Sequence, residues 1–411
     1  MRILILVLML SYCSGVMAKT PLIMGYSDSH ISKVFGQERR YMVALPEQYQ
    51  VNSRHYPTLY IIDADFQFQH VAATVNNLAR MGKIPPMIVV GIATQGNQDY
   101  LKSNTWPSEI EGEEFGGAAI FAQYLQQELI PLIEQTYRTN TQRALAGYSL
   151  GGLTVMQNLL DETSPFNAFL AFSPSLWYDD YGYKKKFEAQ VKNINRHNKP
   201  LFISLANEQG MGVRPLVELL KNKSLVNFKW QFKEYPKETH YSTALPALYD
   251  GLLFLAPDYF IDLDQMMKQK DYLALFALFE AKKSLWTGFN FEWLQSYTLS
   301  KYFFASKQSD SIPEALNWIK EHFADSYNEV LINFALGYNK KQQAEQAKNL
   351  LLSIEKTSLE NAKWHYQIAL SYQQLGDNKL ASQHHQQALQ LAQIQQLESW
   401  EYWELEPYLS F

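Results

Sequence analysis

Residues 143 to 152 read RALAGYSLGG and place one serine between glycines, in the order Gly147-Tyr148-Ser149-Leu150-Gly151. Alone this pattern is weak, because a chain of this length contains it by chance about one time in ten. Its context strengthens it: the apolar run before the serine reads as a buried strand, and the segment after it as the start of a helix. A strained turn of this kind exposes the hydroxyl and places a helix N-terminus behind it. The pattern therefore predicts attack by Ser149 on an acyl carbon.

A serine of this kind needs a base, since its hydroxyl alone is a weak nucleophile. His240 lies in a loop after a strand-like segment and follows the serine, as the chain order of such sites requires. The other histidines before residue 258 fit less well, because three precede the serine and one lies in a polar stretch: His30, His55, His70 and His197. We therefore expect His240 to accept the proton of Ser149.

The third member of the site should be an acid between the serine and the histidine. Glu208 comes directly after the apolar run LFISLA and is the preferred candidate. Asp179, Asp180 and Glu238 are the competitors, and Glu238 lies only two residues before His240. The acid would accept a hydrogen bond from the far ring nitrogen and stabilise the imidazolium.

The elements that must hold these residues form an alternating pattern from residue 19 to about residue 258. Short apolar runs predict strands at residues 40–44, 58–63, 87–92, 143–148, 168–172, 201–205 and 228–235, and residues 116–137 have helical periodicity. Buried runs separated by helices favour an α/β fold with a mostly parallel sheet covered on both faces.

The character of the chain changes near residue 258, and residues 259–411 read as an all-α domain. Ala335, Tyr338, Ala347 and Ile354 recur 34 residues later as Ala369, Tyr372, Ala381 and Ala388, and Gly376 suits a turn between two helices. This period resembles the tetratricopeptide repeat, TPR. A helical domain with a coincidental period is the alternative.

Length and composition restrict the functional classes. A chain of 411 residues favours two domains over one, and 47% hydrophobic residues suffice for sizeable cores. The formal net charge of −5 and the short basic run at residues 184–186 argue against a nucleic-acid partner, which needs a broad basic face.

The first 18 residues read as a secretory signal peptide. Arg2 is followed by an apolar stretch too short to span a membrane and by a small-residue cleavage site that ends at Ala18. An uncleaved anchor is the alternative. Cleavage would remove Cys13, the only cysteine, so that no disulfide could form. We expect a bacterial periplasmic or secreted protein with no stable membrane span.

Several stretches together resemble the Putative esterase family of α/β hydrolases, which includes siderophore (enterobactin-type) esterases, S-formylglutathione hydrolase and feruloyl esterases. They are YPTLYIIDAD, FAQYLQQELIPLIEQTYRTN, RALAGYSLGGL, FSPSLWY and ETHYSTALPALYDGLLFL, spread over residues 30–255. The resemblance implies Ser149 as nucleophile, His240 as base and Glu208 as acid. It also implies an oxyanion hole from the backbone N–H of Leu150 and one from the loop after TLYIID.

One position departs from that family. Relatives have glycine after the first aspartate of this loop, where the present chain has Ala64. If the turn requires a positive φ at Ala64, the second oxyanion donor would be misplaced.

Aromatic residues fall in loops expected at the carboxyl edge of the sheet, where substrates bind in such folds. The candidates for substrate contact are Trp106, Phe115, Trp177, Tyr178 and Tyr241, with ordinary packing as the alternative for each. No metal or other cofactor is expected, because the metalloprotease pattern and a complete dinucleotide loop are absent from the sequence and His384-His385 reads as a solvent-exposed pair.

The sequence thus predicts an exported serine esterase that cleaves carboxylic esters. An acyltransferase with the same residues, or a binding protein that acts through its helical repeats, is the alternative. Cutting the chain near residue 258 is expected to leave a soluble, active domain unless the repeats cover hydrophobic surface.

Overall fold

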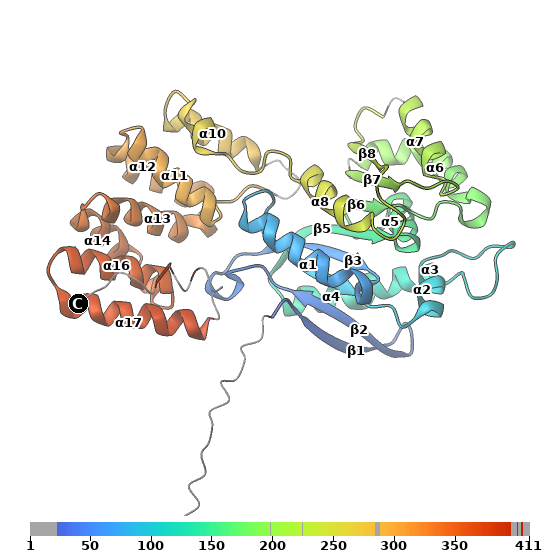
Figure 1. Cartoon of the computed structure of the whole chain (residues 1–411), viewed down its shortest axis with the longest axis horizontal. Coiled ribbons are helices and arrows are strands. Elements are labelled where there is room, and N and C mark those ends of the chain that lie inside the picture. The colour runs from blue at the N-terminus through green and yellow to red at the C-terminus, as the bar shows by residue number, and fades with distance from the viewer. Residues whose placement is uncertain are drawn as a thin grey trace, which may run out of the picture.

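The computed structural model describes residues 23–197, 199–223, 225–283, 288–395, 401 and 404–405. The signal-peptide prediction and Cys13 lie outside these ranges. The first part of the chain forms one eight-stranded sheet in the order β1-β2-β4-β3-β5-β6-β7-β8 (Figure 1). Strands β1 and β2 are antiparallel to their neighbours, and the pairs from β4 through β8 are parallel. The predicted α/β class is confirmed.

The elements of this part have the following bounds: β1 Tyr26–Ser32, β2 Gln37–Ala44, β3 Tyr56–Ile62, α1 Ala64–Arg80, β4 Ile88–Ile92, α2 Asn97–Ser103, α3 Ala118–Tyr124, a π-helical turn Leu125–Leu129, α4 Ile130–Thr136, β5 Thr139–Tyr148, α5 Leu150–Leu160, β6 Ala168–Phe172, α6 Tyr178–His197, β7 Leu201–Ala206, α7 Val213–Asn222, β8 Trp230–Tyr235 and α8 Ala244–Leu255. Strands β2 to β8 correspond to the predicted strands, with shifted ends.

Successive side chains of β3 point to opposite faces of the sheet and pack in two different apolar layers. Leu59 and Ile61 pack with the layer of α1 and α8, whereas Tyr60 and Ile62 pack with the layer of α3 to α7. Every residue of β3 is buried. This explains why the strand reads as a continuous apolar run, since a strand covered on both faces needs no polar side.

The second part of the described chain is helical. Its bounds are α9 Leu263–Met267, α10 Tyr272–Lys282, α11 Trp293–Ala305, α12 Ile312–His322, α13 Tyr327–Lys340, α14 Ala344–Ser353, α15 Glu355–Ser358, α16 Ala362–Gln374 and α17 Asn378–Ile394. Figure 1 shows helices α10 to α17 gathered to one side of the sheet. An all-helical C-terminal region is thus confirmed.

The 34-residue period corresponds to two successive helix pairs, α13 with α14 and α16 with α17. Ala335 and Ala369 occupy equivalent places in the first helices and Ala347 and Ala381 in the second, and all four are fully buried. Gly376 has a φ of +86° between α16 and α17, a conformation that favours glycine. The membership of these pairs in the TPR family stays a prediction.

The two parts share apolar core. One continuous cluster runs from Val71 and Leu78 on α1, through Leu252 on α8, to Phe276 on α10 and Phe334 on α13. A fragment that ends near residue 258 would expose this layer. We therefore now expect such a fragment to aggregate rather than to stay soluble, and the two-domain division itself stays a prediction.

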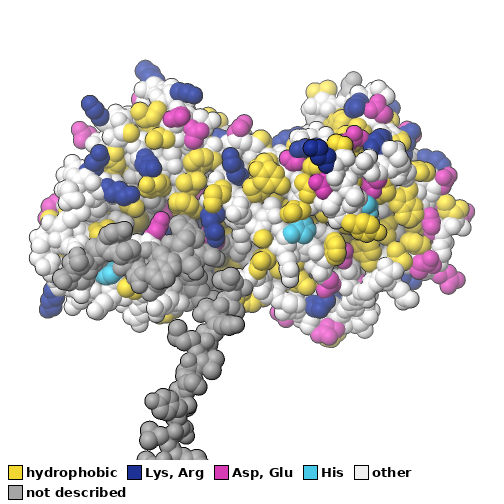
Figure 2. Space-filling model, in the orientation of Figure 1, with side chains coloured by type: hydrophobic (Ala, Val, Ile, Leu, Met, Phe, Trp, Pro, Cys, Tyr) yellow, Lys and Arg dark blue, Asp and Glu magenta, His cyan; other side chains and the backbone are white. Residues whose placement is uncertain are grey.

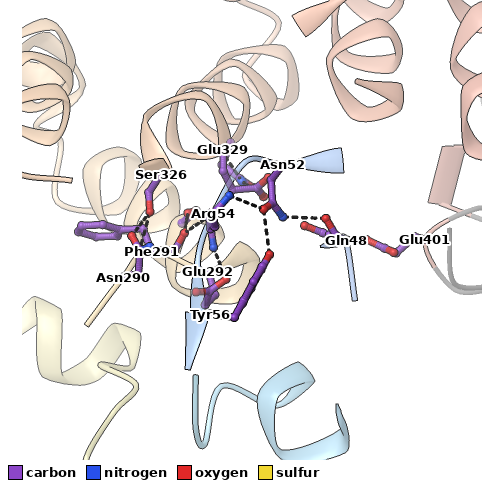
Figure 3. Close-up of polar contacts among 12 residues, drawn as sticks. Gln48, Asn52, Arg54, Tyr56, Asn290, Phe291, Glu292, Ser326, Glu329 and Glu401 are labelled. Carbon is purple, nitrogen blue, oxygen red and sulfur yellow. Dashed lines mark hydrogen bonds and ion pairs between the residues drawn. The ribbon is translucent and has the colours of Figure 1, made fainter. Parts of the chain in front are cut away.

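Polar contacts at the same junction centre on Arg54, which lies just before β3 (Figure 3). Its guanidinium is buried, forms an ion pair with Glu292 and donates to the carbonyl oxygen of Phe291 at 3.0 Å. Ser149 follows β5 at the opposite end of the parallel strands. Since β3 has seven residues, roughly 20 Å of strand separates these two ends. The helical part is therefore anchored at the end of the sheet away from the serine.

The surface carries both signs of charge. On the face shown in Figure 2, Lys and Arg side chains alternate with Asp and Glu side chains over both lobes. Among the described helices, none has the length and apolarity needed to cross a membrane.

Candidate active site

The turn that carries Ser149 has the predicted strained geometry. Ser149 has φ 57° and ψ −120°, directly between β5 and α5. A Cβ atom on Gly147 would lie 2.3 Å from the carbonyl oxygen of Gly151, so a larger residue could not occupy that position without displacing the backbone. The Ser149 N–H donates to the carbonyl oxygen of Phe172 on β6 at 3.0 Å. The elbow is therefore fixed by close backbone packing and by the neighbouring strand.

The structure brings together the three residues that the sequence predicted. The Nε2 atom of His240 lies 3.0 Å from the Oγ atom of Ser149. The Nδ1 atom of the same ring lies 2.7 Å from Oε2 of Glu208, although the N–H direction is not aligned for a hydrogen bond. Loose alignment is common in active sites without substrate. The side chains of His240 and Glu208 are 27% and 14% exposed, so the site is open to ligand but shielded at the acid.

Glu208 is the acid that reaches His240 because of where β7 ends. It lies two residues after that strand, and its carbonyl oxygen accepts a hydrogen bond from Arg214 at 2.7 Å. The side chain of Asp179, a competitor, accepts hydrogen bonds from Trp106 Nε1 and Ser108 Oγ, both at 2.6 Å. The backbone oxygen of Glu238 accepts the Asn207 N–H at 3.0 Å, which ties the acid loop to the histidine loop.

In the loop between β3 and α1, the strained residue is Asp63 and not Ala64. Asp63 has a φ of +62°, whereas Ala64 is the buried first residue of α1 and has no positive φ. As the first residue of a helix, Ala64 has a backbone N–H without an intrahelical acceptor. Alanine is therefore compatible with this loop. Burial raises the pKa of the Asp63 carboxyl, while a hydrogen bond from Thr94 acts in the opposite direction.

The sequence reasoning did not identify Tyr100, which lies against the elbow. Its hydroxyl donates to the carbonyl oxygen of Tyr148 and accepts the N–H of Gly151, both at 3.2 Å. Tyr100 lies on α2, a short helix without a motif of its own. The available sequence signal was only its place after β4, at the same edge of the sheet as the elbow.

The aromatic candidates divide into two groups. Trp106 and Tyr178 are buried, with ring centroids 5.0 Å apart, and the Tyr178 hydroxyl donates to the Trp106 carbonyl at 2.6 Å. The structure therefore favours packing over substrate contact for this pair, and Phe115 packs on Tyr178 in the same way. By contrast, Trp177 is 37% exposed and Tyr241 is 82% exposed, with the Tyr241 ring centroid 6.0 Å from that of His240.

The comparisons with known proteins agree with this geometry. The family model described as "Putative esterase" matches residues 32–225. The ferri-bacillibactin esterase BesA of Bacillus subtilis is 28% identical over 228 residues, which cover 49% of this chain and 78% of the relative. Residues 32–225 of this chain are therefore similar to the Putative esterase family.

Two further relatives bear on the chemistry of this chain. An IroE-like serine hydrolase of Shewanella oneidensis superposes with a TM-score of 0.60 at 26% identity and covers 69% of this chain and 95% of its own. A siderophore enterobactin esterase of Emericella nidulans is 27% identical over 177 residues, 35% of this chain and 58% of the relative. Together with the turn that carries Ser149, these relatives show that the chain is an ester hydrolase of the serine hydrolase type.

The esterase also has a concave site in its helical part. A groove of about 590 Å³ lies between the first helices of successive pairs and is lined in part by Tyr297, Asn333, Lys340, Gln367 and Leu405. Asn333 and Gln367 are 8% and 6% exposed. Since the helical part is anchored at the end of the sheet away from Ser149, this groove lies apart from the active site.

The expectation that His384-His385 is exposed was wrong. His385 is 9% exposed, and its Nε2 lies 2.9 Å from the carbonyl oxygen of Leu405, while Nδ1 of His384 lies 2.9 Å from Nδ1 of His365. Helices α16 and α17 pack against each other here, so that His385 is buried and His384 is partly buried. In the described ranges, no group of three or more His, Asp or Glu side chains is placed to hold a metal ion.

Proposed function

We propose that this protein is an exported serine esterase that cleaves carboxylic esters through Ser149, His240 and Glu208. The observation that carries the proposal is the continuous contact from Ser149 Oγ through the His240 ring to the Glu208 carboxylate, at 3.0 Å and 2.7 Å. A strained serine next to a histidine that itself faces a carboxylate is the arrangement that activates a hydroxyl nucleophile.

The reaction would proceed through an acyl-enzyme. His240 Nε2 accepts the proton as Ser149 Oγ bonds to the acyl carbon, and the carbonyl π electrons move onto oxygen. The tetrahedral intermediate then expels the alkoxide, which takes the proton from His240. Water then attacks the acyl carbon while His240 Nε2 takes a proton from it. The bond between the acyl carbon and Ser149 Oγ breaks, Oγ takes the proton back from His240, and the carboxylic acid product leaves. Glu208 holds the ring and stabilises the imidazolium in both halves.

The developing oxyanion would accept hydrogen bonds from the N–H groups of Leu150 and Ala64. Both residues are the first of a helix, α5 and α1, so their N–H groups have no intrahelical acceptor and carry the positive end of the helix dipole. The positive φ of Asp63 turns the chain so that β3 leads directly into α1.

For the substrate, we propose a siderophore-type or other small acyl ester. Two relatives are named as esterases of siderophores. In this chain the exposed ring of Tyr241 offers aromatic surface beside His240, and Trp177 is a second exposed ring in the segment after β6. Such rings suit a ligand with flat aromatic or long acyl groups.

We further propose that the chain is exported to the periplasm or beyond after cleavage at Ala18. The intact mass of protein recovered from an exporting bacterial host tests this step. Loss of residues 1–18 is the expected result, and full-length protein retained in the cytoplasm would contradict export.

Rapid-mixing kinetics with a chromogenic ester test the hydrolase assignment. A burst of alcohol, equal to the enzyme concentration and followed by a slower steady rate, is expected from an acyl-enzyme whose hydrolysis limits turnover. Ser149→Ala should abolish both phases. Wild-type protein without any ester turnover would overturn the proposal.

An acyltransferase with the same three residues is the second candidate, because the open site admits an acceptor alcohol as well as water. Product analysis with added acceptor alcohols separates the two activities. Hydrolysis predicts free acid as the main product at each acceptor concentration, and transfer predicts a new ester. A protein partner on the helical repeats stays a prediction, and the groove around Tyr297 and Lys340 is the place proposed for it.

A further inference from the structure

We infer that the hydroxyl of Tyr100 is a third, side-chain donor of the oxyanion hole. The inference rests on the proposed function, since it concerns the oxyanion formed when Ser149 attacks an ester. Tyr100 would be a catalytic residue in addition to the nucleophile, the base, the acid and the two backbone donors.

The first observation is the position of the phenol at the base of the elbow. Its oxygen lies 3.2 Å from the Gly151 nitrogen and 3.2 Å from the Tyr148 carbonyl oxygen, so it contacts the backbone on both sides of Ser149. Leu150, whose N–H is the proposed main oxyanion donor, is the residue between Ser149 and Gly151. The phenol therefore borders the space that the carbonyl oxygen of a bound ester must enter.

The second observation concerns the protonation state of Tyr100. Burial raises its pKa to about 12, the charge of Asp63 acts in the same direction, and hydrogen bonds from Gly151, Ser149 and Leu150 act against it. The hydroxyl thus keeps its proton at neutral and mildly alkaline pH. A neutral phenol can donate a hydrogen bond to an anion, whereas a phenolate would repel it.

The third observation is the brace that positions α2. The buried guanidinium of Arg39, 1% exposed, binds both carboxylate oxygens of Asp99 at 2.9 Å each. Asp99 precedes Tyr100 and also accepts the Gln95 N–H at 3.0 Å and the Ser103 hydroxyl at 3.1 Å. A bidentate buried pair fixes both the position and the rotation of this short helix. Tyr100 is therefore preorganised, which an oxyanion donor requires.

The catalytic step needs only a rotation of the phenol hydrogen. In the resting enzyme it points to the Tyr148 carbonyl over 3.2 Å, which is long for an O–H···O bond. As negative charge develops on the substrate oxygen, the hydrogen turns to the oxyanion, because a bond to a charged acceptor is about twice as strong as one to a neutral acceptor. No proton leaves Tyr100, and the atoms and charges of the ester reaction stay as described above.

Hydrolysis of a matched ester and thionoester by Tyr100→Phe tests the inference. Sulfur is a poor hydrogen-bond acceptor, so loss of an oxyanion donor slows the ester more than the thionoester. We expect kcat for the ester to fall roughly 10- to 10³-fold with little change in KM. The ester to thionoester rate ratio should fall at least about tenfold. A shifted elbow would instead slow both substrates by the same factor.

Tyr183→Phe is the matched control. Tyr183 is also a buried phenol, and its hydroxyl donates at 2.9 Å to the carbonyl oxygen of Met156, which lies on α5 after the elbow turn. This variant should retain the wild-type ratio and rate. An ester rate of Tyr100→Phe within twofold of wild type, or an equal loss on both substrates, would overturn the inference. Wild-type enzyme inactive on both substrates would instead overturn the proposed function.

A second variant covers the case in which Tyr100→Phe does not fold. Replacement of Tyr100 by a fluorinated tyrosine of lower pKa retains the shape and the hydroxyl group. If the phenol donates to the oxyanion, kcat must fall as pH rises through the new, lower pKa, because the phenolate cannot donate. A kcat profile identical to that of the wild type would overturn the inference.

Discussion

The Nε2 atom of His240 lies 3.0 Å from the Oγ atom of Ser149, although 91 residues separate them in the chain. The serine is held by the turn between β5 and α5, and the histidine by the loop between β8 and α8. In that loop the Thr239 N–H donates to Ser242 Oγ at 3.0 Å, which closes a tight turn around the histidine. The contact between these two side chains therefore depends on the order of strands in the sheet and on two local turns.

Replacement of Ser149 should separate activity from stability. Ser149→Ala and Ser149→Gly are both expected to abolish ester hydrolysis. They differ in backbone strain: at φ 57° and ψ −120°, glycine relieves a conformation that costs a residue with a Cβ roughly 1 to 3 kcal/mol. Thermal unfolding should thus occur at a higher temperature for Ser149→Gly than for Ser149→Ala. Equal unfolding temperatures would contradict the strained elbow, and retained activity in either variant would contradict the nucleophile.

Replacement of the acid should distinguish Glu208 from Glu238. Glu208→Gln removes the charge that faces His240 and is expected to lower kcat roughly 10²- to 10⁴-fold. Glu238 contributes its backbone oxygen to Asn207, so Glu238→Gln should stay within about threefold of wild type. Steady-state kinetics on one ester measure both. The opposite order of effects would move the acid to Glu238.

The sequence could place Ser149, His240 and Glu208 in one candidate site because the requirements on such residues are local. A small-residue turn after an apolar run identified Ser149, and the ends of later strands identified Glu208 and His240. Strand β1 was missed, since its first six residues are exposed or only partly buried at the sheet edge and its sequence YSDSHIS lacks apolar alternation. The strain considered at Ala64 came from the family pattern, in which glycine occupies this position. In the structure the positive φ lies one residue earlier, at Asp63.

Other features require the three-dimensional packing. Trp106 and Tyr178 looked like exposed loop aromatics, but each buries the other, and no sequence period encodes that contact. Arg54 and Glu292 are 238 residues apart and meet only because the helical part packs on the amino end of β3. Tyr100 is placed by the pairing of Arg39 with Asp99, which joins residues 60 apart. Such long-range pairs have no signal in a single sequence.

The buried ion pair at the junction should be costly to break on one side. Glu292→Gln leaves the Arg54 guanidinium, 7% exposed, without its carboxylate, and we expect about 3 kcal/mol less stability toward denaturant. Glu234→Gln is the control, because its pair with Arg214 is 46% and 40% exposed and should contribute less than about 1 kcal/mol. Equal losses in the two variants would show that the junction does not depend on this pair.

The stability of the helical part should depend on pH through His365 and His384. Burial lowers the pKa of His365, and burial together with the charge of His365 lowers the pKa of His384. In the unfolded chain these histidines bind protons as pH falls below the ordinary histidine pKa of 6.5, whereas in the folded chain they stay neutral to a lower pH. The stability that is present above pH 6.5 is therefore lost as pH falls.

Denaturant titrations at about pH 7.5 and about pH 5 measure this dependence. His384→Gln should reduce the loss of stability between these two pH values, because it removes one titrating ring. The glutamine amide retains a hydrogen-bond donor for His365. The remaining loss of stability includes a contribution from the partly buried ring of His70, because burial lowers its pKa as well. An unchanged loss in His384→Gln would exclude the histidine pair as its source.

The most direct test of the catalytic assignment is intact-mass labelling with a fluorophosphonate, followed by peptide mapping, with Ser149→Ala as control. The account predicts one adduct per chain, on the peptide that contains Ser149, and none on the control. Folded wild-type protein without an adduct, or an adduct on another serine, would contradict the assignment of Ser149 as an activated nucleophile.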